Sequence, residues 1–290
     1  MKLAFVTGAN KGIGLAIVEK LARALGPTGE WDVYLTARSE ELGKKSCEAL
    51  QKAGLNVKFH QLDITDMDSR KRFLQFVRAN YPDGISIAVN NAGIAYNSHS
   101  ANKLELQYIL ILPVPLISPW NFFRTWPKMR GKMFLILDAV CRVVQVSSGV
   151  SHMTLKRLSN DLYSKFTSKM DLDELRSCVA DFVKHAEAGD HEKFGWPSWG
   201  YGVSKLALSK ASYILGEMIK NDPRHIVMNA CCPGYVNTDM TRHKGTRTVE
   251  EGADTPFYLA TLPLGVTQPI NEFVSDRKIL PWSKDATVSW

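Results

Sequence analysis

The chain has 290 residues, of which 45% are hydrophobic and 22% are charged. This composition is close to that of soluble globular proteins, and it excludes a disordered chain, a collagen-like repeat and a small disulfide scaffold. The 36 basic residues exceed the 29 acidic ones, which gives a net charge of +7. No run of five like charges accompanies this excess, so we expect scattered surface lysines rather than a nucleic-acid partner.

Short apolar runs alternate with segments of helical periodicity along the chain. The expected strands are 3–7, 33–36, 57–62, 85–89, 142–146, 226–230 and 273–275, and the expected helices are 13–25, 66–79 and 201–219. Continuous apolar runs are typical of strands buried on both faces of a parallel sheet, and their alternation with helices predicts a doubly wound arrangement. We therefore expect one α/β, Rossmann-like domain over residues 1–290.

The cysteines and apolar segments bear on the compartment. Five cysteines include no C-x-x-C pair, which indicates neither a disulfide framework nor a metal site and fits a reducing compartment. The apolar stretch 109–117 is too short to span a bilayer and contains two prolines. We expect a cytoplasmic protein without a membrane partner.

A glycine-rich turn separates the first expected strand from the first expected helix. Gly8, Gly12 and Gly14 fall in this turn. Backbone without a Cβ can approach a pyrophosphate closely, and the following helix offers free N–H groups and a partial positive charge. The turn predicts a dinucleotide site.

The end of the second expected strand distinguishes between dinucleotides. Sheets that bind NAD usually carry an acid there, which accepts from the ribose 2′-hydroxyl. This chain has Arg38, which can form charge-assisted bonds with a 2′-phosphate, and Lys11 supplies a second positive charge. NADPH/NADP⁺ is therefore the predicted cofactor.

Tyr201 and Lys205 are four residues apart in a segment with helical periodicity, so they share one face of the expected helix. An ammonium held near a phenol stabilises phenolate, and we expect it to lower the pKa of Tyr201 towards that of a working general acid.

At these residues the chain resembles the short-chain dehydrogenases/reductases. The matching segments occur in the family's order: 7–14, 62–63, 90–93, 146–148, Tyr201 with Lys205, and 233–234. Four further segments, 10–14, 59–64, 195–198 and 229–234, resemble the monomeric NADPH-dependent carbonyl reductases.

The resemblance implies a role for individual residues. Tyr201 donates the proton to a substrate carbonyl oxygen, Lys205 supports it and holds the nicotinamide ribose, and Ser148 positions the carbonyl. The implied cofactor-binding residues are Gly8, Asn10, Lys11, Gly12, Ile13, Gly14, Arg38, Asp63, Ile64, Asn90, Tyr201, Lys205, Pro233, Val236 and Thr238. The implied substrate-binding residues are Ser148, Trp196 and Tyr235. Packing remains an alternative for Trp196, and closure of a local turn remains one for Asp63.

Ser148 and Tyr201 are 53 positions apart, whereas the family usually separates them by about a dozen. Apolar residues recur at near-helical spacing within 172–183, which predicts an ordered helical insertion over about 151–199. In the carbonyl reductases a similar insertion covers the face that oligomeric relatives use for pairing. The resemblance therefore implies a monomer.

Residues 98–141 conflict with the rest of the pattern. A crossover helix is expected between the fourth and fifth strands, but four prolines interrupt this segment. Asn121 is the candidate for the family's fourth catalytic residue, although Arg124 stands where a glycine is usual. The segment is either a divergent substrate loop or a stretch altered by splicing or a frame error.

Two functions follow from these alternatives. The first is NADPH-dependent reduction of aldehydes, ketones or quinones to alcohols, with Tyr201 as the proton donor. The second is a catalytically impaired or non-catalytic NADP-binding protein of the same fold.

Overall fold

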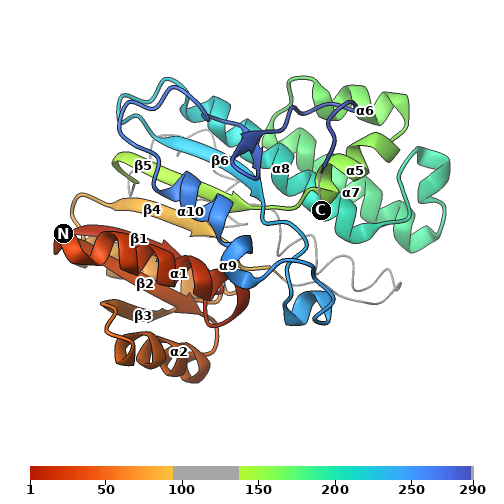
Figure 1. Cartoon of the computed structure of the whole chain (residues 1–290). Helices are drawn as coiled ribbons and strands as arrows, with labels where there is room; N and C mark the ends of the chain where they lie inside the picture. The colour runs from red at the N-terminus through yellow and green to blue at the C-terminus, as the bar shows by residue number, and fades with distance from the viewer. Residues whose placement is uncertain (94–136, 289–290) are drawn as a thin grey trace.

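The computed structural model describes residues 1–93 and 137–288 (Figure 1). In these residues eight strands form one sheet in the order β3-β2-β1-β4-β5-β6-β7-β8. The strands are β1 (Lys2–Val6), β2 (Trp31–Ala37), β3 (Val57–Gln61), β4 (Ile85–Asn90), β5 (Leu137–Val146), β6 (Val227–Cys232), β7 (Phe273–Ser275) and β8 (Lys278–Ile279). Neighbouring strands from β3 to β7 pair in parallel, and β8 is antiparallel to β7.

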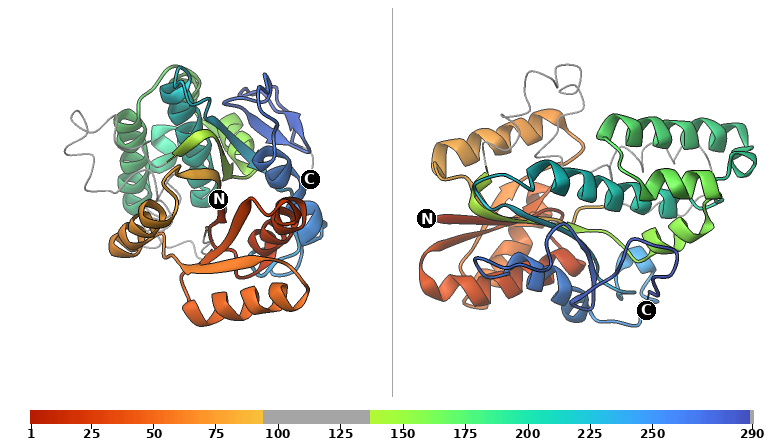
Figure 2. Two further views of the ribbon diagram at one scale, coloured as in Figure 1. Left: turned by 90° about the vertical axis from the view of Figure 1, so that its left-hand side faces the viewer. Right: turned by 90° about the horizontal axis from the view of Figure 1, so that it is seen from above.

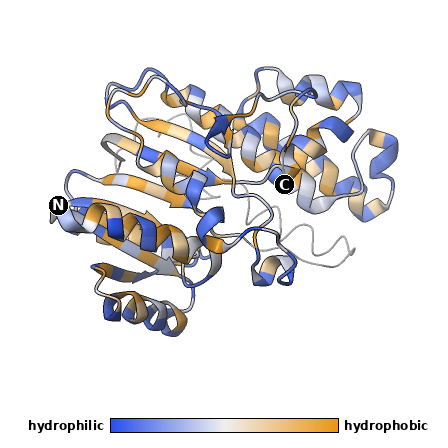
Figure 3. Ribbon diagram, viewed as in Figure 1, coloured by the Kyte–Doolittle hydropathy of each residue, from blue (hydrophilic) through white to orange (hydrophobic). Residues whose placement is uncertain are grey.

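Helices cover both faces of this sheet (Figure 2). Against one face pack α1 (Gly12–Leu25), α2 (Glu40–Lys52) and α10 (Asp254–Ala260), and against the other pack α3 (Met67–Asn80) and α8 (Gly200–Ile219). The strands are mostly apolar, whereas the helices alternate between apolar and polar positions (Figure 3). The doubly wound prediction is therefore confirmed, and the strand order reverses between β1 and β4, where such sheets bind ligands.

Two local features differ from the prediction. Helix α2 was not expected, although Ser39 caps it by accepting from the Leu42 amide at 3.3 Å, and Glu40 and Glu41 favour its first turn. Strand β5 begins at Leu137, so residues 137–141 of the atypical segment are strand. The register pairs Leu137 with Ile85 of β4. Asn121 and the rest of the atypical segment lie outside the described residues.

The predicted helical insertion stands between β5 and α8. It consists of α5 (Val150–Arg157), α6 (Asn160–Thr167), α7 (Leu172–Ala188) and the 3₁₀ helix η3 (His191–Phe194). Asp171 and Glu174 form a capping box that fixes the start of α7. The insertion has its own apolar core, which is continuous with the inner face of α8.

Trp196 belongs to that core, so the packing alternative is correct and the predicted contact with substrate is wrong. The side chain is only 2% exposed and packs against Phe166 and Phe182, with ring centroids 5.9 and 5.3 Å away. Its indole N–H donates to Asp181 at 3.3 Å. A large indole gains more from enclosure between these helices than from a rim position, provided its polar atom finds an acceptor.

We predict that Trp196→Ala lowers the free energy of unfolding by about 3–5 kcal/mol, because it removes a fully buried indole and leaves a cavity. Chemical denaturation measures this loss. Trp196→Phe keeps most of the contacts and should cost less, while Leu264→Ala, at a side chain 74% exposed, should change stability by less than about 0.5 kcal/mol. Equal stabilities for all three variants would contradict the assignment.

Candidate active site

A cavity of about 1010 Å³ opens at the carboxyl ends of the strands. It lies at the switch point, where open α/β sheets usually bind their ligands. Residues that follow β1, β4, β5 and β6 line one side of it, and residues of the insertion line the other. Its lining includes Ile13, Asn91, Ser148, Trp199, Tyr201, Lys205, Pro233, Tyr235, Val236 and Thr238.

The glycine turn packs tightly on the loop after β4. The Asn91 amide donates to the carbonyls of Thr7 and Gly8 at 3.0 and 3.2 Å. A Cβ at Gly14 would lie 2.5 Å from that amide nitrogen, and one at Gly8 would lie 2.9 Å from the Cα of Ala92. Asn91 therefore holds the turn in shape. Asn91 lies in the segment 90–93 that the sequence analysis identified, but the residue predicted there to bind the cofactor was Asn90.

Asn90 ends β4, close to the expected cofactor site. Its side-chain oxygen is buried and finds no hydrogen-bond donor within residues 1–93 and 137–288. Such an atom is costly unless something donates to it. Gly12 has φ +58°, a left-handed conformation that favours glycine, and a Cβ built there would touch the Thr238 methyl group at 3.5 Å. These residues adjoin the cavity-lining residues Ile13, Asn91 and Thr238, and their chemistry fits a dinucleotide.

Lys11 is not free in the structure. It forms an ion pair with Asp239, at the start of the 3₁₀ helix η4 (Asp239–Thr241), and this contact lowers the pKa of Asp239. The neighbouring Asn10 contributes its carbonyl, which accepts from Ser46 on α2 at 2.8 Å. A phosphate bound by Lys11 competes with this exposed pair, which is a weak contact in water.

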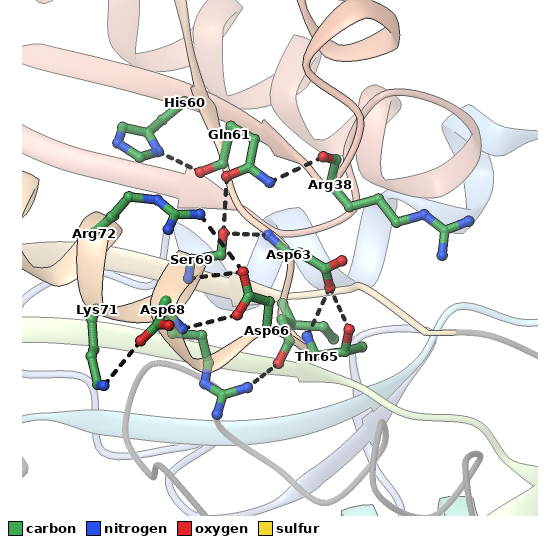
Figure 4. Close-up of polar contacts among 12 residues, drawn as sticks. Arg38, His60, Gln61, Asp63, Thr65, Asp66, Asp68, Ser69, Lys71 and Arg72 are labelled. Carbon is green, nitrogen blue, oxygen red and sulfur yellow. Dashed lines mark hydrogen bonds and ion pairs between the residues drawn. The ribbon is translucent and has the colours of Figure 1, made fainter.

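Arg38 and Asp63 lie at the adenine end of the expected cofactor site, and Figure 4 shows how they are arranged. The exposed Arg38 side chain extends away from the cluster, while its carbonyl accepts from Gln61 at 3.1 Å. Asp63 uses one carboxylate oxygen to close a turn, accepting from the amide and the hydroxyl of Thr65 at 2.8 Å each. Ile64 is half-buried against the apolar core between the sheet and helices α3 and α8. Asp63 therefore has a structural role, and Arg38 faces solvent where a 2′-phosphate is expected.

Ser148 and Tyr201 meet in the cavity wall. The Ser148 hydroxyl hydrogen-bonds to the Tyr201 phenol, and it also accepts from the Val150 amide at 3.3 Å. The neighbouring Ser147 turns away and bonds to Ser209 of α8 at 2.7 Å. Only Ser148 of the serine pair thus contacts the phenol.

The pKa of Tyr201 is higher than expected. Burial raises it to about 12, and the Ser148 hydrogen bond offsets only part of that effect. The predicted lowering by Lys205 is not seen, because the ammonium nitrogen lies 5.9 Å from the Tyr201 ring centroid and burial dominates. Tyr201 therefore stays protonated at neutral pH, as a proton donor must.

Burial also lowers the pKa of Lys205, to about 8. The side chain is 8% exposed, and its ammonium donates to the Val146 carbonyl at the end of β5 at 3.3 Å. The described lining of the cavity contains no Asp or Glu to stabilise its charge. Lys205 therefore changes charge within the physiological range.

The insertion and the loop after β6 form the outer wall. Trp199 lines the cavity, whereas Trp196 does not, and the Arg157 guanidinium carbon lies 5.1 Å from the centroid of the Trp199 ring. His191 bonds to Ser198 at 2.7 Å, and both line the cavity. Tyr235 lines the opposite side. The sequence did not single out His191, and Ser198 entered only as part of the segment 195–198, because their spacing matches no catalytic motif.

Other chemistry finds little support in the described residues. All five cysteines are free and buried, and burial raises the pKa of the Cys232 thiol. Within 1–93 and 137–288, no group of His, Cys, Asp and Glu is arranged to hold a metal ion. No helix in these ranges is long and apolar enough to cross a membrane.

The fold and this site define a class of protein, and comparison with known proteins agrees. The profile of the short chain dehydrogenase family matches residues 2–184. The chain belongs to this family.

Particular relatives are carbonyl reductases. Carbonyl reductase (NADPH) 1 of Rattus norvegicus is 41% identical over 284 residues, covering 97% of this chain and 98% of the relative. The Homo sapiens protein of the same name is 40% identical, with 97% and 98% covered, and carbonyl reductase (NADPH) 3 of Mus musculus is 39% identical, also with 97% and 98% covered.

Solved structures share the fold. Salutaridine reductase from Papaver somniferum has a TM-score of 0.76 at 25% identity, covering 95% of this chain and 100% of that one. Menthone neomenthol reductase from Mentha piperita has a TM-score of 0.72 at 24% identity, covering 94% and 98%.

We predict that Asn91→Asp lowers the free energy of unfolding by about 2 kcal/mol, because a carboxylate cannot donate to the Thr7 and Gly8 carbonyls. The loosened turn should also weaken NADPH binding roughly tenfold, or about 1.4 kcal/mol. Thermal unfolding and a fluorescence titration with NADPH measure the two effects. Asn80→Asp, an exposed amide on α3, is the matched control. Unchanged affinity in Asn91→Asp would remove Asn91 from the cofactor site.

Proposed function

We propose that this protein reduces carbonyl compounds, namely aldehydes, ketones or quinones, to alcohols with NADPH. The observation that carries the proposal is the contact of Ser148 with Tyr201 in the wall of one cavity, with Lys205 buried beneath them. The Asn90 oxygen, which has no partner among the described residues, and the exposed Arg38 support a phosphorylated dinucleotide that extends from this cavity. The names of the carbonyl reductase relatives agree.

In this proposal the cofactor lies along the switch point. Gly8, Gly12 and Gly14 give the pyrophosphate access to the start of α1, while Lys11 and Arg38 contact the 2′-phosphate. Asp63, Ile64 and Asn90 border the adenosine half. Ile13, Pro233, Val236 and Thr238 border the nicotinamide half. NADPH bound there supplies the hydride, because none of the lining side chains can.

The chain's own residues supply the proton and the orientation. Ser148 donates to the substrate carbonyl oxygen and holds it beside the Tyr201 hydroxyl. Tyr201 then donates its proton to that oxygen as negative charge develops on it. The phenolate left on Tyr201 lies near the Lys205 ammonium, which stabilises it until a solvent proton replaces the one lost. Tyr235, His191, Ser198 and Trp199 border the substrate.

The alternative function is a non-catalytic NADP-binding protein. Such a protein needs the residues that bind the cofactor but not the Ser148, Tyr201 and Lys205 side chains. Such a protein has no requirement for the Ser148–Tyr201 contact or for a lysine buried without an acidic neighbour in the described lining. Retaining a buried charge of this kind costs stability, so a catalytic purpose explains it better.

We also propose a cytoplasmic monomer that forms one domain over residues 1–290, with the insertion at about 151–199. Helices α5 and α7 cover α8 through a shared apolar core, which removes that helix face from pairing with another copy. The five free cysteines suit a reducing compartment.

Tyr201→Phe tests the function. We expect the rate of carbonyl reduction to fall by about 10²–10⁴-fold, because the proton donor is lost, while NADPH still binds. Consumption of NADPH with a quinone or an aromatic aldehyde measures the rate, and fluorescence titration measures binding. Tyr258→Phe on α10 is the control for the same chemical change outside the cavity. A wild-type chain that binds NADPH but reduces no aldehyde, ketone or quinone would favour the alternative function.

The pKa of Lys205, at about 8, predicts the pH dependence. Below pH 8 the ammonium is charged and stabilises the phenolate, so kcat/KM should be level; above pH 8 it should fall as that charge is lost. Tyr201, with a pKa of about 12, remains protonated throughout. Assays from pH 6 to pH 10 give the profile, roughly the range that brackets both limbs. Lys205→Met should be slow but level over this range, and an equal decline in that variant would assign the titration to another group.

A further inference from the structure

Residues 280–288, which we call the closing segment, leave β8 and pass over the insertion to end beside α5 (Figure 1). Two anchors fix this segment. The Trp282 indole donates to the Phe166 carbonyl at 3.1 Å and packs on the His152 ring at 4.9 Å. Two residues later the Lys284 ammonium lies 4.3 Å from the centroid of the Tyr163 ring. The closing segment is therefore tied to the insertion before it reaches the cavity wall.

Beyond these anchors Val288 packs on the backbone of Gly149. A Cβ built on Gly149 would lie 2.3 Å from the Val288 Cγ1 atom, and 3.4 Å from both the Val288 Cβ atom and the Cys232 sulfur. Gly149 has φ −58° and ψ −19°, a conformation open to every residue type except where space forbids it. A methyl group of Val288 therefore leaves no room for a Cβ at position 149.

Gly149 directly follows Ser148 in the chain and is the N-cap of α5. Its amide bonds to the Cys232 sulfur, so β6 holds it on one side and Val288 holds it on the other. The Ser148 hydroxyl depends on this peptide for its direction, because it also accepts from the Val150 amide at 3.3 Å. A shift of Gly149 therefore moves Ser148 relative to Tyr201.

We propose that Val288 is a positioning residue for Ser148: its contact with Gly149 fixes the serine hydroxyl against the Tyr201 phenol. The inference rests on the proposed function, since positioning has meaning only for a reaction at Tyr201. It assigns to the closing segment a part in the active site, although Val288 lies 140 positions along the chain from Ser148.

A pair of compensating substitutions tests the contact. Gly149→Ala adds the methyl group that collides with Val288, and the double variant Gly149→Ala with Val288→Ala removes the collision, since the remaining neighbours lie at 3.4 Å. Gly26→Ala is the matched control, because Gly26 has a similar helical backbone conformation and a built Cβ there meets nothing within 4 Å. For each variant, kcat, KM for the carbonyl substrate, NADPH affinity and the thermal midpoint are measured.

We expect Gly149→Ala to lower kcat by roughly tenfold or more, because small misplacements of a reacting group are costly, with NADPH affinity unchanged. Val288→Ala alone should be slower than the wild type, because the contact that positions Ser148 is lost, and the double variant should regain kcat to within about twofold of Val288→Ala, since the two sites are coupled. A double variant as slow as Gly149→Ala would overturn the role of Val288, and so would a Gly149→Ala variant as fast as the wild type. A wild-type chain without reductase activity would instead overturn the proposed function; the thermal midpoints then show separately whether the two side chains collide.

Discussion

The burial of Lys205 beneath Tyr201 is the constraint on which the site depends. The described lining of the cavity has no acidic residue to offset the ammonium charge, and the ammonium donates to a backbone carbonyl at the end of β5. Burying the charged ammonium costs free energy, and this cost lowers the pKa of Lys205 to about 8. The same enclosure keeps Tyr201 protonated. One environment thus produces a ready proton donor and a nearby group that holds the charge left behind.

The rest of the fold places that environment beside a ligand site. The carboxyl ends of β1, β4, β5 and β6 meet at one edge of the sheet, so residues far apart in the chain share one cavity. Asn91 ties the glycine turn after β1 to the loop after β4. The insertion then encloses the other side and covers α8. Cofactor, proton donor and substrate wall come from separate parts of the chain.

The arrangement of candidate site residues could be predicted where the residues lie close together in the sequence. The glycines at 8, 12 and 14, and the pair Tyr201 and Lys205, depend only on a local turn or on one helix. The predictions that failed depend on long-range packing. Trp196 was assigned to the cleft from its position in the chain, but three helices of the insertion bury it. The effect of Lys205 on Tyr201 was predicted from charge alone, and burial outweighed it.

The sequence by itself determined the alternation of strands and helices, the glycine turn and the helical face shared by Tyr201 and Lys205, because each follows from a local period or from a residue's own conformational preference. Tertiary structure alone decided that Ser148 contacts Tyr201, that the Asn91 amide hydrogen-bonds to the glycine turn and that Val288 packs against Gly149. It also set the pKa values, because desolvation depends on every atom around a group. These outcomes come from contacts between segments tens to hundreds of residues apart, and a single sequence carries no local signal for them.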